Sequence, residues 1–210
     1  MNKAELDALV EGLSRQESLT VLGHSIPDGD CVGSVTAMVW ALKNMGKDVT
    51  AIIEDGIPAM YRFLNGTEAI SSLFNLPRIN DCLVYLDCAN AERVGDKLAG
   101  LLPQANTVIN IDHHISNTGF GSLNLVDVNA SSTCEIIFRL LKHMNTPITV
   151  DIATPLYCGI VMDTGSFKYS TTSPATHRLA ADLLEAGVDL DLVRTRLFES
   201  KTRIEVALQK

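Results

Sequence analysis

Residues 19–34 read Leu-Thr-Val-Leu-Gly-His-Ser-Ile-Pro-Asp-Gly-Asp-Cys-Val-Gly-Ser, and they combine a strand, a turn and the start of a helix. The apolar residues 19–24 predict the strand, and a helical pattern over residues 33–44 follows the Pro/Gly-containing turn. Further β-rich runs occupy residues 49–54, 82–87 and 107–112. Strands that alternate with helical patterns predict βαβ units, and so an α/β fold with a parallel sheet flanked by helices on both faces.

The second half of the chain predicts mainly helices. Residues 132–135, Ser-Thr-Cys-Glu, have the spacing of a capping box in front of an apolar helical face. Ser173 and Pro174 predict the start of another helix, which runs to residue 186. A charged helical pattern then covers residues 189–210 without a stop signal.

The composition sets limits on function. The chain has 210 residues, of which 46% are hydrophobic, and this is enough for a core and excludes a disordered chain. Its net charge of −8 argues against tight binding to a long duplex nucleic acid, which requires a basic surface. The longest apolar run, residues 35–42, is far shorter than the ~20 residues of a membrane helix. These features predict a cytoplasmic protein without a membrane partner.

Histidine and aspartate residues gather where the predicted strands and helices end. Because ligands of an open parallel sheet bind beyond the carboxyl ends of its strands, we expect these residues to share one rim. The set comprises His24, Asp28, Asp30, Asp87, Asp112, His113, His114 and Asp163. Each motif alone has an ordinary explanation, such as a turn, a helix cap or a surface histidine pair. Without a functional site, all of these ordinary explanations would have to be true at once. The set as a whole therefore favours a functional site.

This set of side chains predicts a metal centre. Carboxylates crowded at one rim repel one another, and their pKa values rise unless a cation compensates them. One divalent cation relieves this conflict, and two relieve it better. Oxygen and imidazole ligands without a thiolate suit Mn²⁺, with Mg²⁺, Fe²⁺ and Co²⁺ as alternatives.

The four motifs together resemble those of the DHH phosphoesterase superfamily, in the same order along the chain. They are His24-x-x-x-Asp28-x-Asp30-x-x-Gly33-Ser34, Asp87, Asp112-His113-His114 and Asp163-Thr164-Gly165. The resemblance covers about residues 15–200 and implies a Rossmann-like domain. Residues 88–95 and 196–200 are most similar to the branch of oligoribonucleases and pAp phosphatases.

The resemblance also implies a role for each site residue. One cation would be held by His24, Asp28 and Asp87, and the other by Asp30, Asp87, His113 and Asp163. Asp87 would therefore bridge two cations that activate a water for in-line attack on phosphorus.

Three further residues have implied roles around the reacting phosphate. His114 would face the substrate as a proton donor or phosphate contact, and Asp112 would orient a neighbouring imidazole. Arg93 is a candidate phosphate contact, with an ordinary surface arginine as its alternative.

The same resemblance implies a division of the chain. Residues 1–188 would form the catalytic domain, and residues 189–210 would begin a helix that links to a C-terminal substrate-binding domain. The glycine-rich, GGGH-like segment of that second domain does not occur in this sequence. We therefore expect the isolated domain to hydrolyse its substrate poorly. We expect the apolar face of the linker helix, including Leu197 and Leu208, to be partly uncovered, which would allow the chain to form a homodimer.

The function implied is that of a metal-dependent phosphoesterase that acts on short oligonucleotides or on nucleoside 3′,5′-bisphosphate. An inorganic pyrophosphatase or polyphosphatase would use the same metal chemistry, and so would a RecJ-type single-strand exonuclease. A nucleotide-sensing or scaffolding module that binds metal without catalysis is the alternative from another class. Comparison of pyrophosphate with a dinucleotide as substrates separates the first two.

Overall fold

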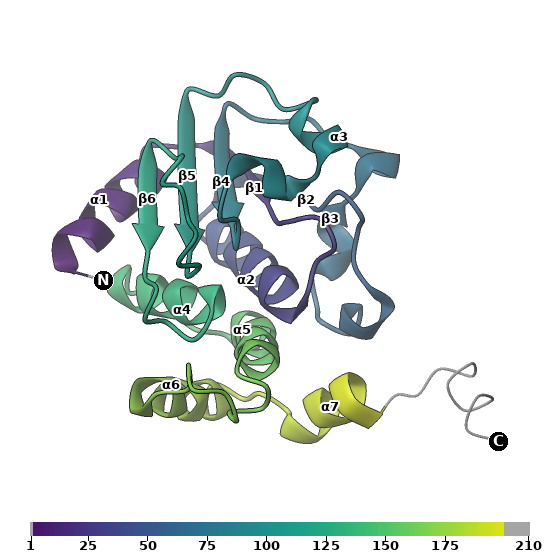
Figure 1. Cartoon of the computed structure of the whole chain (residues 1–210), viewed down its shortest axis with the longest axis vertical. Helices are drawn as coiled ribbons and strands as arrows, with labels where there is room; N and C mark the ends of the chain where they lie inside the picture. The colour runs from purple at the N-terminus through teal and green to yellow at the C-terminus, as the bar shows by residue number, and fades with distance from the viewer. Residues whose placement is uncertain (1, 200–210) are drawn as a thin grey trace.

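The computed structural model describes residues 2–199, and within them the strands form one six-stranded sheet with the order β3-β2-β1-β4-β5-β6 (Figure 1). All neighbouring strands in this sheet pair in parallel. The strands are β1 (Ser18–Leu22), β2 (Asp48–Ile52), β3 (Ile70–Ser71), β4 (Cys82–Leu86), β5 (Thr107–Asp112) and β6 (Leu123–Val126). The α/β fold and the parallel sheet are thus confirmed.

The four strands predicted from the sequence are all present, and two strands were not predicted. The predicted run 107–112 coincides with β5, and the other three end one or two residues earlier than predicted. The two strands that were missed lie at the edges of the sheet. β3 has only two residues and β6 only four, so neither is long enough to show a clear sequence pattern.

Helices account for most of the remaining regular structure. They are α1 (Lys3–Ser14), α2 (Gly29–Asn44), α3 (Asp96–Ala99), α4 (Thr133–His143), α5 (Val150–Asp163), α6 (Pro174–Glu185) and α7 (Leu190–Arg194). α2 begins four residues earlier than predicted, because the Asp28 carboxylate caps it by accepting hydrogen bonds from the Asp30 and Cys31 amides. Among residues 2–199, no helix has both the length and the apolar character needed to cross a membrane.

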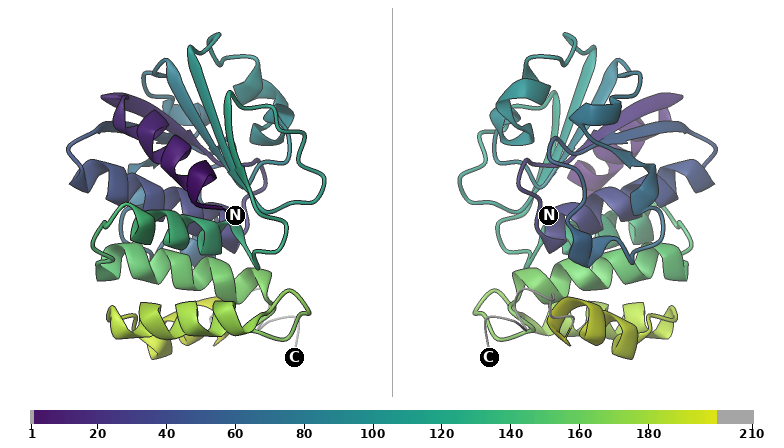
Figure 2. Two further views of the ribbon diagram at one scale, coloured as in Figure 1. Left: turned by 90° about the vertical axis from the view of Figure 1, so that its left-hand side faces the viewer. Right: turned by 90° about the vertical axis from the view of Figure 1, so that its right-hand side faces the viewer.

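The two faces of the sheet are covered unequally. Alternate residues of β4 point to opposite faces, with Val84 and Leu86 in the larger core and Leu83 and Tyr85 in the smaller one. The larger core packs against α1, α2, α4 and α5, and α6 and α7 lie beyond α5 on the side away from the sheet (Figure 2). The smaller core is closed by Leu98 of the short helix α3 and by neighbouring loops.

Close packing of α2 against α5 brings two of the candidate ligands together. A β-carbon at Gly33 of α2 would lie 2.4 Å from the Pro155 carbonyl oxygen of α5, and one at Gly159 of α5 would lie 3.1 Å from Cα of Asp30 in α2. Both positions therefore need glycine for this approach. The result is that the buried Asp30 of α2 lies beside the carboxyl end of α5.

The C-terminal part of the described chain differs from one expectation. Leu197, expected on an uncovered apolar face, is buried against the rest of the chain in a π-helical turn at Thr195–Glu199. Exposed apolar side chains in this part include Leu190 and Phe198 instead. Residues 200–210 of the predicted linker helix, with Leu208, lie outside the described residues. The homodimer and the domain boundary at residue 188 stay predictions.

Candidate metal centre

The predicted site residues meet beyond the carboxyl ends of the central strands. His24 lies two residues after β1, Asp87 follows β4 directly, and Asp112 is the last residue of β5. Asp163 comes from elsewhere, since it is the last residue of α5. In Figure 1 the arrowheads of β5 and β6 point toward α4 and α5. β1 and β4 are neighbours at the point where the strand order reverses, and crevices at such points are the usual binding sites of open α/β sheets.

The first ligand group consists of His24, Asp28 and Asp87. Nε2 of His24 lies 3.4 Å from Oδ2 of Asp87 and 3.7 Å from Oδ1 of Asp28. Nδ1 of the same ring lies 2.7 Å from the Ser25 carbonyl oxygen, which can only accept, so Nδ1 carries the hydrogen. In the neutral ring, the Nε2 lone pair therefore points at the two carboxylates, as a metal ligand requires. Burial opposes a charge on this ring, but both carboxylates raise the pKa of His24.

The second ligand group consists of Asp30, His113 and Asp163. Nε2 of His113 lies 3.3 Å from Oδ2 of Asp163 and 3.8 Å from Oδ2 of the fully buried Asp30. Burial and the nearby carboxylates of Asp87 and Asp163 raise the pKa of Asp30 well above its ordinary value. Burial, supported by the Asp87 charge and opposed by His113, raises the pKa of Asp163 to about 6. This is the charge conflict that a cation would relieve.

Asp87 lies between the two groups. Its Oδ2 faces His24, whereas its Oδ1 lies 3.7 Å from His113 Nε2 and 3.6 Å from His114 Nδ1. Three groups of candidate ligands each have their ligand atoms within 4.8 Å of one another: His24–Asp28–Asp87, Asp30–His113–Asp163 and Asp87–His113–His114. Asp87 itself has a φ of +59°, a left-handed conformation that aspartate tolerates better than most residues. The two oxygens of this carboxylate thus face different groups of candidate ligands.

A hydrogen-bonded chain holds His114 at the edge of the centre. Oδ1 of the buried Asp112 lies 2.7 Å from His114 Nδ1, and its Oδ2 accepts from Asn117 Nδ2 at 2.6 Å. The hydrogen bond to Asp112 raises the pKa of His114, although burial opposes this. Burial would raise the pKa of Asp112, but the His114 and Asn117 hydrogen bonds lower it. The His114 side chain is 40% exposed and is therefore open to a solute. Sequence reasoning missed Asn117, because no motif includes it.

Two contacts fix the turn that carries His24 and Asp28. The carbonyl of Arg93 accepts from the Ser25 amide at 2.7 Å, so the exposed Arg93 lies beside this turn, and its role as a phosphate contact stays a prediction. The Asp55 carboxylate accepts from the amide of Ile26 at 2.8 Å, and Ile26 has a φ of +55°. The sequence showed neither contact, since each joins segments that are distant along the chain.

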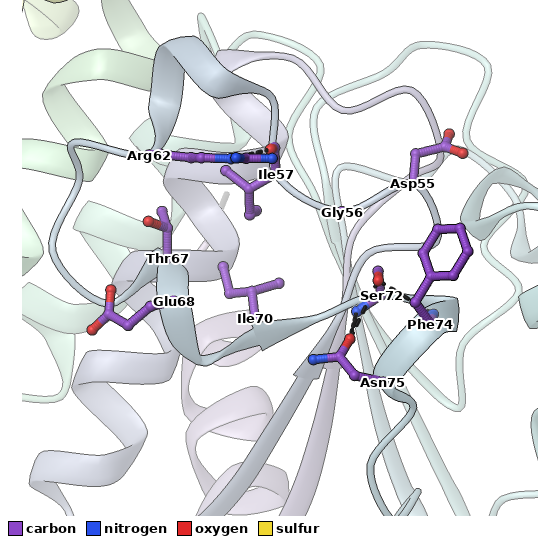
Figure 3. Close-up of a pocket in the computed structure, with 10 residues that line it drawn as sticks. All are labelled: Asp55, Gly56, Ile57, Arg62, Thr67, Glu68, Ile70, Ser72, Phe74 and Asn75. Carbon is purple, nitrogen blue, oxygen red and sulfur yellow. Dashed lines mark hydrogen bonds between the residues drawn. The ribbon is translucent and has the colours of Figure 1, made fainter.

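A cavity of about 450 Å³ lies beside the edge strand β3 (Figure 3). It is lined by Asp55, Gly56, Ile57, Arg62, Thr67, Glu68, Ile70, Ser72, Phe74 and Asn75. None of the predicted site residues lines this cavity. One lining residue, Asp55, also accepts from the Ile26 amide in the turn between His24 and Asp28.

Residues 18–160 match the DHH family, N-terminal domain. The chain belongs to the DHH family. This DHH domain is 36% identical over 194 residues to a bifunctional oligoribonuclease and PAP phosphatase NrnA of Thermus thermophilus, with 92% of this chain and 56% of that protein covered. It is 27% identical over 207 residues to the protein of the same name in Bacillus subtilis, with 93% of this chain and 62% of that protein covered. The chain thus spans somewhat more than half the length of these curated relatives.

A solved structure shows the same fold for this DHH domain. It is the crystal structure of an exopolyphosphatase-related protein from Bacteroides fragilis, with a TM-score of 0.91 and 24% sequence identity. The match covers 99% of this chain and 64% of that one. The family match and the two NrnA relatives confirm the resemblance to the DHH superfamily and its oligoribonuclease/pAp phosphatase branch.

Proposed function

We propose that this chain is the catalytic part of a metal-dependent phosphoesterase that hydrolyses short oligonucleotides or nucleoside 3′,5′-bisphosphate. The observation that carries the proposal is the position of Asp87, with one oxygen facing each ligand group. Membership of the DHH family and the names of the two NrnA relatives support it.

The donor set fits two divalent cations. His24, Asp28 and Asp87 would hold one, and Asp30, Asp87, His113 and Asp163 would hold the other. All donors are carboxylate oxygens or imidazole nitrogens, which favours Mn²⁺, with Mg²⁺, Co²⁺ and Fe²⁺ as alternatives. The raised pKa of Asp163, about 6, agrees with a site that a cation would complete.

Two cations at this rim would supply an activated water and neutralise the charge on the phosphoryl oxygens. The protein's own groups then orient the substrate and move a proton. His114 is held by the buried Asp112, so its imidazole would donate a proton to the leaving oxygen or a hydrogen bond to a phosphate. The side chain of Arg93, beside the His24 turn, is the proposed second phosphate contact.

We propose a short substrate because the chain is acidic, with 17 basic and 25 acidic residues. A long strand would need a row of basic side chains to replace its counterions. A short substrate needs only the cations and a few phosphate contacts. We place this activity in the cytoplasm.

Asp87→Asn tests the two-cation proposal. The amide is neutral and offers one oxygen in place of two, so the negative charge between the cations is removed and we expect both cations to be lost. Hydrolysis should fall at least about 1,000-fold, since metal ions supply several kcal/mol of transition-state stabilisation and each ~1.4 kcal/mol is tenfold. Metal content after gel filtration is the primary readout. Asp48→Asn, at the exposed start of β2, is the control and should keep both ions. Two tightly bound ions in Asp87→Asn would disprove the bridging role.

Substrate length tests the second half of the proposal. In excess Mn²⁺, the protein should turn over a dinucleotide and pAp faster than a strand of about 25 nucleotides, because its net charge of −8 opposes the binding of a long polyanion. Pyrophosphate belongs in the same assay. Faster hydrolysis of the long strand would favour a RecJ-type exonuclease, and preference for pyrophosphate would favour a pyrophosphatase.

A further inference from the structure

The first turn of α4 points into the proposed metal centre. The hydroxyl of Thr133, which is fully buried, lies 3.0 Å from Oδ1 of Asp87. The amides of Thr133 and Cys134 donate to the two carboxylate oxygens of Asp30, at 2.6 and 2.9 Å. One end of a single helix therefore contacts a carboxylate from each ligand group.

The direction of the Thr133–Asp87 hydrogen bond follows from the chemistry of the two groups. An ionised carboxylate can only accept, so the hydroxyl donates to Oδ1. The terminal torsion of an aspartate side chain is soft and roughly two-fold, so the side chain alone does not set the plane of the carboxylate. A donor held against one oxygen sets the plane of the carboxylate. Here the Thr133 hydroxyl on Oδ1 leaves Oδ2 facing His24.

Thr133 is itself held rigidly. The carboxylate of Glu135 is completely buried and accepts from the Ser131 amide at 3.1 Å and from the Thr176 hydroxyl at 3.0 Å. Arg139 pairs with the other oxygen of Glu135. This network ties the start of α4 to the preceding loop and to α6, so the Thr133 hydroxyl has a fixed position from which to act.

We propose that Thr133 is a positioning residue of the metal centre, whose hydroxyl holds the Asp87 carboxylate so that each of its oxygens faces a different cation. This inference rests on the two-cation function proposed above. The side chain of Thr133 acts on Asp87 alone, because the contacts to Asp30 are made by backbone amides. The two effects can therefore be separated by substitution.

The test compares Thr133→Val with Thr133→Ser. Valine keeps the shape and branching of the side chain but removes the donor, whereas serine keeps the donor. Calorimetric titration of chelator-treated protein with Mn²⁺ measures the affinity directly, without an activity assay. We expect valine to weaken the affinity for Mn²⁺ about 10- to 100-fold, the usual effect of losing a residue that orients a metal ligand. Serine should stay within about threefold of wild type, well inside that range.

Thr36→Val is the matched control. Thr36 is also buried, and its hydroxyl donates to the carbonyl of Val32 within α2 rather than to a proposed ligand. This control should lose stability but not affinity for Mn²⁺. If Thr133→Val fails to fold, Thr133→Ala and Thr133→Ser give the same comparison.

Two outcomes overturn the inference at different levels. Unchanged Mn²⁺ affinity in Thr133→Val, while Asp87→Asn loses both ions, would leave the proposed function intact and remove the role of Thr133. Retention of both ions in Asp87→Asn would remove the proposed function, and the inference with it.

Discussion

Asp163 is a ligand candidate for which a proton and a cation would compete. Burial and the Asp87 charge raise the pKa of this carboxyl to about 6, whereas an unfolded aspartate has a pKa of about 4. A carboxyl with a raised pKa in the folded state binds its proton more tightly there than in the unfolded chain. Without a cation, the stability that it contributes is therefore greatest at low pH and is lost as the pH rises from about 4 to above 6.

Asp163→Asn should therefore stabilise the metal-free protein, and more at pH 7 than at pH 5. At pH 7 the substitution removes an ionised group that faces other carboxylates, whereas at pH 5 the wild-type group already carries its proton. We expect a difference on the order of 1 kcal/mol at pH 7, below the full ~1.4 kcal/mol per pKa unit because the side chain is partly exposed.

Urea denaturation of chelator-treated protein at both pH values measures this effect. Asp48→Asn, far from the centre, should show no such pH dependence. An equal effect of Asp163→Asn at pH 5 and pH 7 would contradict the interpretation.

At the scale of elements, the contact between α2 and α5 sets the distance between two ligands. A β-carbon at Gly159 would lie 2.3 Å from Cys134 Sγ and 3.0 Å from Oδ1 of Asp30. Gly159→Ala must push α5 away from α2 and α4, which should cost about 1–3 kcal/mol of folding free energy. It should also weaken Mn²⁺ binding, because Asp30 and Asp163 move apart.

Thermal unfolding and Mn²⁺ titration together test Gly159→Ala. Gly100→Ala is the control, since its β-carbon would make only ordinary contacts at 3.5 Å and its φ is −69°. Full stability together with normal metal binding in Gly159→Ala would show that this close approach does not position the ligands.

The sequence alone predicted some features of the helices and strands and not others. Apolar runs predicted the central strands, because a strand buried on both faces has few polar residues. The start of α2 was missed because Asp28 both caps the helix and belongs to the proposed site. The predicted capping box is only half present, since Ser132 caps α4 but the Glu135 side chain bonds to Ser131 instead.

The candidate site likewise has residues that the sequence predicted and contacts that it did not. Residues that end strands were predicted together because parallel topology places strand ends at one edge. The supporting contacts of Thr133, Asn117 and Asp55 were not predicted. Each of the first two completes a hydrogen bond to a buried carboxylate, and such partners are chosen by packing, which leaves no regular spacing in the sequence.

At the scale of the molecule, the proposed ligands extend from His24 to Asp163 and come together only in the folded chain. A cation that binds only the folded state stabilises it by about 2.7 kcal/mol at 100 times its dissociation constant. For a domain of this size that is a rise in Tm of about 5–10 °C. Thermal unfolding at increasing Mn²⁺ concentration should show this rise, and Asp87→Asn should not. A Tm of the wild-type protein that is independent of Mn²⁺ would argue against the centre.

The strand order has a consequence for the time course of synthesis. Two parallel strands must be joined by a crossover connection, so both partners of β1, β2 and β4, lie well after it in the sequence. As the chain leaves the ribosome, β1 pairs first with β2, and its other edge waits for β4. His24 and Asp28 are thus exposed long before Asp87 is made, and Asp163 emerges later still. The nascent chain carries an unfinished sheet edge until β4 is made, and the proposed ligand set is complete only once Asp163 has emerged.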